Sequence, residues 1–243
     1  MKRFFLFLLI VPFLASCNDD DQCSLDDYMI DIATVENPNQ ATNFYFTLDD
    51  GERMWTAASE LKYYRPKDGQ RIIANYTILA ERPASSTHGF DVRLNDAYEV
   101  LTKGIFNITP ATQDSIGNDY ISIRDMWIGS DYLNVEFEYP GYNKTHFINL
   151  VSDTSKTYTD GKVHLEFRHN DNGDYPNYFR WGIVSFNLRS LQTSPNGSIG
   201  LVIHTKEFNL GEETYNLTYK FGTNASMVKH QKISIKPERA IMQ

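Results

Sequence analysis

The sequence predicts an all-β protein in which a small barrel is followed by an antiparallel β-sandwich. Short segments alternate apolar and polar residues with period two, the pattern of strands that bury one face. Asp-Gly or Asn-Gly pairs separate these segments at 50–51, 68–69, 160–161, 172–173 and 196–197. Such pairs supply the positive φ angles of tight hairpin turns. Aromatic residues, which favour strands, are abundant, with 15 Phe, 15 Tyr and 3 Trp in 243 residues.

Residues 1–16 form a predicted lipoprotein signal peptide. Lys2 and Arg3 precede an apolar stretch over 4–15. As a helix this stretch would span about 18 Å, short of the ~30 Å bilayer core, which favours a cleaved signal over a membrane span. Leu14-Ala15-Ser16-Cys17 matches the bacterial lipobox. We therefore expect Cys17 to be the acylated, palmitate-bearing N-terminus; the alternative is an ordinary secretory signal with a chance cysteine.

Residues 17–26 form a predicted acidic tether. Asp19, Asp20 and Asp21 directly follow the lipidated cysteine. They resemble the export signal of Bacteroidota lipoproteins, which sends them to the outer leaflet of the outer membrane. The tether therefore predicts a lipid-anchored, surface-exposed outer-membrane protein. The alternative is a solvated spacer without an export role.

Residues 27–108 are predicted to form the barrel domain, with about five strands. Phe44, Phe46 and Leu48 share one face of an alternating segment. The run over 72–79 is almost continuously apolar, as a strand buried on both faces would be. Only 59–64 has a brief helical pattern, and it ends at a proline.

Residues 109–119 are predicted to be a linker, and 120–243 a sandwich of about seven strands. Segments 133–139, 165–167 and 215–221 alternate clearly. Within the linker, Asp114-Ser115-Ile116 matches the acceptor motif of Bacteroidota O-glycosylation. Ser115 is therefore a candidate O-glycosylation site.

The sequence resembles the NigD-like lipoproteins of Bacteroidota. The resemblance covers most of the chain after the tether and rests on YMIDIATV (28–35), FYFTLDDGERMWTAAS (44–59), YYRPKDGQRIIANYTIL (63–79), DSIGNDYISIRDMWIGSDYLNVEFEY (114–139), HFINLV (146–151) and YTDGKVHLEFRHN (158–170). It implies an N-terminal OB-like domain and a C-terminal β-sandwich. The family takes its name from a gene beside a bacteriocin locus and brings no catalytic motif.

No hydrolase, zinc-protease or phosphate-loop motif occurs in the sequence, so we expect a non-enzymatic protein without a cofactor or metal site. Three patterns have both a functional and a plainer interpretation. His164 and Glu166 could share a metal or form a solvated strand face. The segment 171–174 could bind calcium or form a simple turn. Glu136 and Glu138 could act as a glycosidase pair or be solvated on one strand.

The net charge and the aromatic residues indicate which classes of ligand the barrel domain could bind. The chain carries a net charge of −8, and residues 27–108 hold twelve acidic and eight basic side chains, which disfavours nucleic acid. OB-like domains also bind oligosaccharides. Trp55, Tyr63 and Tyr64 could stack on sugar rings if they are exposed. Trp55 follows a hairpin and is expected in the core instead, whereas Tyr63 and Tyr64 are the better candidates for an exposed platform.

A second aromatic segment, over 175–181, supplies a candidate ligand loop with Tyr175, Tyr178 and Trp181. The alternative is that these rings cap the sandwich. The leading hypothesis is a lipid-anchored envelope protein that binds or assembles with an envelope protein or glycan. The alternatives are a glycan-binding accessory lipoprotein of a polysaccharide-uptake system and, more weakly, bacteriocin self-protection.

Overall fold

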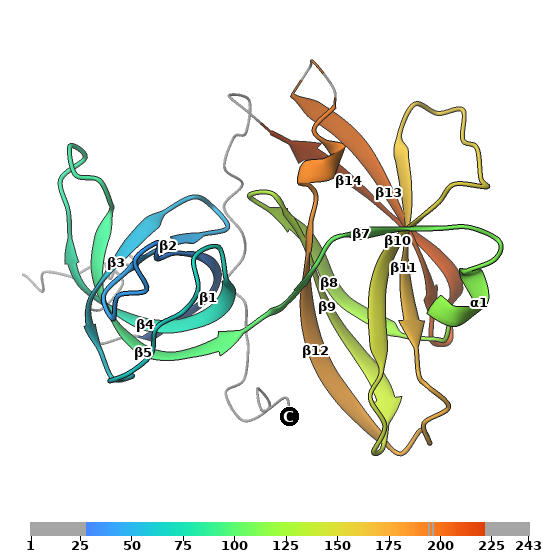
Figure 1. The fold of residues 1–243 in the computed structure, drawn as a ribbon, viewed down its shortest axis with the longest axis horizontal. Coiled ribbons are helices and arrows are strands. Elements are labelled where there is room, and N and C mark those ends of the chain that lie inside the picture. The colour runs from blue at the N-terminus through green and yellow to red at the C-terminus, as the bar shows by residue number, and fades with distance from the viewer. Residues whose placement is uncertain (1–27, 194, 196, 222–243) are drawn as a thin grey trace, which may run out of the picture.

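The structure, a computed structural model, describes residues 28–193, 195 and 197–221. The predicted signal peptide, Cys17 and the acidic tether with Asp19, Asp20 and Asp21 lie outside these residues. The described chain forms a β-barrel and a β-sandwich that lie side by side (Figure 1). No helix in this part of the chain has the length and apolar character needed to cross a membrane.

The barrel has the strand order of an OB fold. It consists of β1 (Tyr28–Glu36), β2 (Tyr45–Leu48), β3 (Arg53–Ser59), β4 (Arg71–Glu81) and β5 (Phe90–Glu99). These strands close in the order β1-β2-β3-β5-β4, with β3 and β5 parallel and the other pairs antiparallel. Phe44, Phe46 and Leu48 are buried in its core, which confirms the face assigned to them.

The sandwich has a five-stranded and a four-stranded sheet. The first has the order β14 (Gly211–Lys220), β13 (Ser198–Glu207), β11 (Val163–Asn170), β10 (Phe147–Asp153) and β7 (Ile105–Ile108). The second has the order β6 (Leu101–Lys103), β12 (Tyr178–Asn187), β9 (Tyr132–Gly141) and β8 (Ser122–Gly129). Pairing is mainly antiparallel, as expected, but β7–β10, β11–β13 and β6–β12 are parallel. Apolar side chains from both sheets form the core.

The domain boundary lies earlier than the sequence predicts. Strands β6 and β7 directly follow the barrel, and each joins a different sheet of the sandwich. The sandwich therefore begins after Val100 and not after the predicted linker. Residues 109–119 lead from β7 towards β8, and they include the short helix α1 (Gln113–Ile116). The brief helical pattern over 59–64 forms a turn instead.

The two domains share a small apolar interface formed by Ile32, Ile73, Val100, Trp127 and Ile183. This contact explains the continuous apolar run of β4. Ile72 and Ala74 point into the barrel core, whereas Ile73 points toward the sandwich. The prediction that this strand is buried on both faces is confirmed for these residues.

A buried ion pair lies beside the apolar interface. The Arg71 guanidinium donates to both carboxylate oxygens of Asp49, at 2.6 and 2.9 Å, and the two side chains are 0% and 8% exposed. Asn134, from the sandwich, donates to Asp49 at 2.7 Å and accepts from Arg71 at 2.9 Å. Ser185 donates to the Asn134 oxygen at 2.6 Å. The charges are matched within the barrel, and Asn134 and Ser185 of the sandwich complete their hydrogen bonds across the domain boundary.

Candidate functional site

The outer face of β2 and β3 carries a pair of aromatic rings. Tyr45 and Trp55 are direct neighbours in the β2–β3 register, and their ring centroids lie 4.5 Å apart. Met54 and Thr56, on either side of Trp55, are buried inside the barrel, so Trp55 points outward and is only partly buried. The expectation that Trp55 lies in the core is therefore wrong.

Arg53 fixes one side of this aromatic pair. Its guanidinium carbon lies 3.9 Å from the centroid of the Tyr45 ring, a cation–π contact. The same guanidinium donates to both oxygens of Glu36 on β1, to Oε1 at 3.2 Å and to Oε2 at 2.7 Å. Partial burial alone would raise the pKa of Glu36, but the hydrogen bonds from Arg53 and Thr47 hold it below its usual value. The carboxylate thus stays ionised and orients Arg53.

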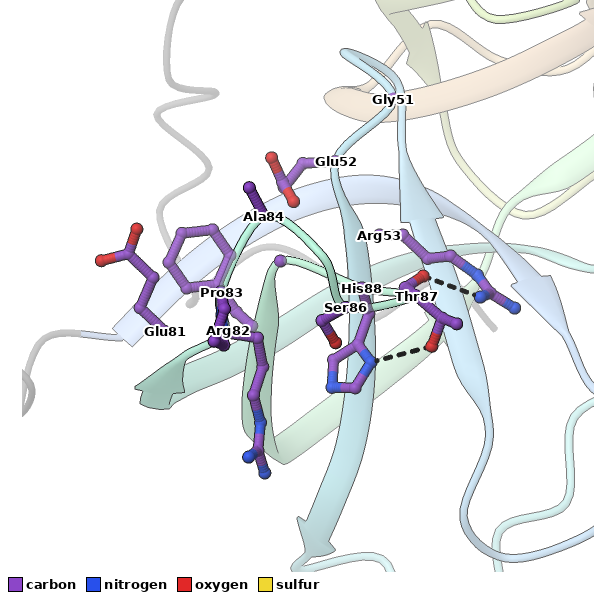
Figure 2. A pocket seen from close by; sticks show the side chains of 12 residues that line it. Gly51, Glu52, Arg53, Glu81, Arg82, Pro83, Ala84, Ser86, Thr87 and His88 are labelled. Carbon is purple, nitrogen blue, oxygen red and sulfur yellow. Dashed lines mark hydrogen bonds between the residues drawn. The ribbon is translucent and has the colours of Figure 1, made fainter.

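A cleft of about 410 Å³ opens beside this face, between the β2–β3 turn and the β4–β5 loop (Figure 2). Arg53 crosses its edge and donates to the Thr87 carbonyl at 2.9 Å. His88 reaches from the loop toward β2, with its ring centroid 5.5 Å from that of Tyr45. Arg53 and His88, which line the cleft, thus both contact Tyr45, so the aromatic pair lies directly beside the cleft.

Asp91 on β5 holds the β4–β5 loop in place. It accepts a hydrogen bond from His88 Nε2 at 2.7 Å and pairs with Arg82. The hydrogen bond from Arg82 is the main reason that the pKa of Asp91 lies below its usual value. Gly89 of the loop lies against the end of the Glu52 side chain from the β2–β3 turn, since an added Cβ would lie 1.8 Å from Glu52 Oε1.

This arrangement suits binding of a polar ligand that also presents an apolar face. OB folds commonly bind oligosaccharides and oligonucleotides on strands 2 and 3 and on the β1–β2 and β4–β5 loops. The aromatic pair lies on those two strands, and the cleft is lined by the β4–β5 loop. Cleft residues of both charge signs, including Glu52, Glu81, Arg53 and Arg82, provide donors and acceptors for hydroxyl groups.

The predicted platform of Tyr63 and Tyr64 does not form. Tyr63 is 89% exposed, but Tyr64 turns inward and packs edge-on against Phe44, with centroids 6.1 Å apart. The Tyr64 hydroxyl is buried, and it has no hydrogen-bond partner among the described residues. Only one ring of the pair therefore faces solvent.

The three residues of the predicted sandwich loop are separated. Tyr175 and Tyr178 are 69% and 61% exposed. Trp181, already in β12, packs against the domain interface and donates to Glu136 Oε1 at 2.6 Å. The structure adds exposed aromatic residues from three other segments, which the sequence did not indicate. Tyr142 lies against Tyr178, with ring centroids 6.5 Å apart. Phe208 lies against the exposed Phe179, and Tyr120 packs on Phe208.

The Glu136–Glu138 and His164–Glu166 pairs singled out from the sequence have protein partners. Glu138 pairs with Arg124, whereas Glu136 accepts from Trp181. Glu166 pairs with Lys156 and Arg168, and His164 instead contacts Asp160 and His204. Among the described residues, no group of three or more His, Cys, Asp or Glu side chains is arranged to hold a metal ion.

The turn over 171–174 is held by backbone donors. Asp174 accepts N–H bonds from Tyr142 and Asn143 and contacts His146 Nε2 at 3.2 Å. Desolvation opposes ionisation of Asp174, but these hydrogen bonds outweigh it and hold its pKa well below the usual value. Ser115, the candidate glycosylation site, lies within α1, and its side chain is outside the described part of the structure.

Comparisons with known proteins agree with this architecture. The NigD-like N-terminal OB domain family matches residues 32–100, and the NigD-like C-terminal β-sandwich domain family matches residues 104–219. The chain has no significant match among curated proteins.

Several solved structures are similar over most of their length. A Bacteroides vulgatus protein of unknown function is 32% identical, with a TM-score of 0.70 over 84% of this chain and 95% of that chain. A Parabacteroides distasonis protein called toxin-related is 36% identical, with a TM-score of 0.69 over 80% and 94% of the two chains. A NigD-like immunity protein from Bacteroides caccae, 18% identical, shares the fold with a TM-score of 0.59 over 78% and 90%.

Proposed function

The chain belongs to the NigD-like family, and we propose that it is a lipid-anchored binding protein of the outer membrane whose OB domain binds an oligosaccharide. The lipobox ending at Cys17 and the acidic residues Asp19, Asp20 and Asp21 support the anchor and its exposure at the cell surface. Several acyl chains on one cysteine give stable membrane attachment.

The observation that carries the proposed ligand is the Tyr45–Trp55 pair beside the cleft of about 410 Å³. A sugar ring has an apolar face that stacks on aromatic rings and hydroxyl groups that bond to the polar lining. The negative charge of the barrel domain favours this ligand over a nucleic acid, whose phosphates it would repel. The proposed role is binding, since the aromatic pair and the polar cleft supply contacts for a ligand.

The ligand is tested with Trp55→Ala. The soluble mature protein is titrated calorimetrically with a panel of neutral and acidic oligosaccharides and with single-stranded DNA. We expect binding to a member of the oligosaccharide panel and a loss of about tenfold in affinity in the variant, equivalent to roughly 1.4 kcal/mol. Trp55→Phe, which keeps a ring, should recover part of the affinity.

The matched control for that experiment is Tyr63→Ala, which removes an exposed ring outside the cleft lining. It should bind as tightly as the unaltered protein. Binding only to DNA, no binding to any oligosaccharide, or equal losses in the Trp55 and Tyr63 variants would each contradict the proposed ligand.

The anchor is tested by Cys17→Ala, which removes the only sulfur that the lipobox presents for acylation. We expect the variant to lose labelling by a palmitate analogue and to leave the membrane fraction. Replacing Asp19, Asp20 and Asp21 with Ala should retain acylation but reduce cleavage by external protease. Persistent acylation of the Cys17 variant would disprove the anchor, and unchanged protease access would disprove the export role.

Bacteriocin self-protection is a second candidate function. The names of two similar structures, one called toxin-related and one called an immunity protein, favour it. A strain without the gene should then become more sensitive to bacteriocins of neighbouring strains, and unchanged sensitivity would exclude this role. The oligosaccharide titration does not depend on this result.

A further inference from the structure

The outer face of the five-stranded sheet holds a second, smaller cavity. Its volume is about 220 Å³, below the ~300–1,000 Å³ of pockets for drug-sized ligands. Strands β11, β13 and β14 and the β10–β11 loop supply most of its lining. Gln113 in α1 and Asn118 just after it also line the cavity, so the segment between β7 and β8 forms part of its wall.

Arg168 is the buried charged group of this cavity. Its side chain is only 4% exposed, yet among the described residues it donates only to Glu166 Oε2, from Nε at 2.8 Å and Nη2 at 2.6 Å. The other oxygen of Glu166 accepts from Lys156 at 2.6 Å. A guanidinium has five N–H donors. Arg168 therefore holds further donors beside the cavity that it lines.

His204 contributes an acceptor to the same cavity. The Asp160 carboxylate accepts from His164 Nε2 at 3.1 Å, so the proton of a neutral His164 ring lies on Nε2. His164 Nδ1 then accepts from His204 Nε2, 2.9 Å away. With both rings neutral, His204 keeps an unprotonated Nδ1. Tyr158 stacks on His164 at 3.5 Å between centroids and fixes the orientation of that ring.

The charges in the cavity decide which class of ligand it suits. Lys156 and Arg168 are balanced by Glu166 and Glu212, so neither an anion nor a cation gains from a net field. Hydrogen-bond donors and acceptors both line the cavity. The donors belong to Arg168, Lys156 and the amides of Gln113 and Asn118, and the acceptors to Glu166, Glu212 and the His204 imidazole. A hydroxyl group donates and accepts at once and fits such a lining. We propose that this cavity binds one uncharged monosaccharide unit.

This inference shares with the proposed function only the class of ligand, because the cavity lies in the other domain. The test is a nuclear magnetic resonance titration of the ¹⁵N-labelled mature protein with glucose, galactose, mannose and N-acetylglucosamine. Parallel titrations use glucuronate as the anion and methylammonium as the cation. We expect one of the neutral sugars to shift the Arg168 and His204 signals with a Kd of about 1–10 mM.

The double variant Gln113→Ala/Asn118→Ala removes two amides whose side chains make no hydrogen bond elsewhere in the described structure. It should weaken binding about tenfold to thirtyfold, the effect of two lost hydrogen bonds. The matched control is Asn143→Ala, an exposed amide outside the cavity, which should leave the Kd unchanged. Trp55→Ala should also leave these shifts intact, so failure at this site and failure at the OB site are distinguishable.

Three results would overturn the inference. The first is the absence of shifts at Arg168 and His204 with every neutral sugar. The second is a response to glucuronate or methylammonium alone, which would assign the cavity to an ion. The third is a sugar response that survives in the Gln113/Asn118 variant.

Discussion

Removing the Asp49 carboxylate should uncouple the two domains and strongly destabilise the protein. In Asp49→Ala the Arg71 guanidinium, which is 0% exposed, stays buried without its counter-ion. Breaking a buried pair in this way costs about 3–5 kcal/mol. Arg71 keeps Thr34, Asn134 and the weaker contact with Ser185 as partners, at 3.0, 2.9 and 3.4 Å, so we expect the lower end, about 3 kcal/mol.

The loss is measured by calorimetry and by urea unfolding of the soluble mature chain. For a protein of this size, 3 kcal/mol corresponds to a fall in Tm of about 6–12 °C. We also expect the single unfolding transition to separate into two, because Asp49 joins the barrel to Asn134 and Trp127 of the sandwich. The control is Glu60→Ala, which breaks an exposed 3.8 Å contact with Arg93 and should cost less than about 0.5 kcal/mol.

A double-mutant cycle separates the pair from general disruption. In Asp49→Leu/Arg71→Met both charges are absent and no ion remains unpaired. The double variant should therefore lose clearly less stability than the sum of the two single variants. A loss below about 1 kcal/mol in Asp49→Ala, or strictly additive losses in the cycle, would refute the energetic role of this buried pair. A transition that stays single in Asp49→Ala would refute the coupling of the two domains through Asp49.

Two further predictions concern stability. In Tyr64→Phe a buried hydroxyl without a described partner is removed, so the free energy of unfolding should rise by about 1 kcal/mol in urea titrations. Burial, and then the charges of Glu99 and Asp96, raise the pKa of the Tyr64 hydroxyl to about 12 in the folded protein. Above pH 10 the unfolded chain therefore loses this proton before the folded chain does, which lowers the stability of the parent protein. Because Tyr64→Phe has no such proton, the variant should lose less stability than the parent between pH 10 and 12. A destabilised variant or an unchanged alkaline profile would contradict this reasoning. In Gly129→Ala the new Cβ would lie 2.2 Å from Asp49 Cγ, so the free energy of unfolding should fall by about 1–3 kcal/mol in thermal unfolding. An unchanged stability would mean that the β2–β3 turn moves freely away from the new methyl group.

Local patterns predicted the cores of both domains because strand burial follows period-two alternation. They failed for Trp55 because a polar residue, Thr56, occupies an inward position beside it. The Thr56 hydroxyl is satisfied there: it accepts from the Phe44 N–H at 2.8 Å and donates to the Phe44 carbonyl at 2.9 Å. A polar residue at this position gives no sign in the sequence that it points inward and that Trp55, its neighbour, points outward. The hydrogen bonds that reverse this assignment come from a residue before β2.

The other differences arise from contacts between distant parts of the chain. Strands β6 and β7 have only three and four residues, too few for a clear alternation, and each pairs with a strand far along the sequence. Arg71, at the start of an apolar strand, has the sequence appearance of a solvated strand end. Its burial depends on Asn134 and Ser185, which belong to the other domain. No local pattern contains that information.

The β2–β3 hairpin connects the proposed ligand face to the domain interface. Tyr45 and Trp55 lie on its outer face, and Asp49 lies in its turn, held by Arg71 from the barrel and Asn134 from the sandwich. A hairpin of this length would be free to bend at its tip without such a contact. Because the turn is fixed at Asp49 and the cleft begins at Gly51, the sandwich helps to fix one wall of the OB cleft. The sandwich therefore stabilises the geometry of the barrel face that we propose binds the oligosaccharide.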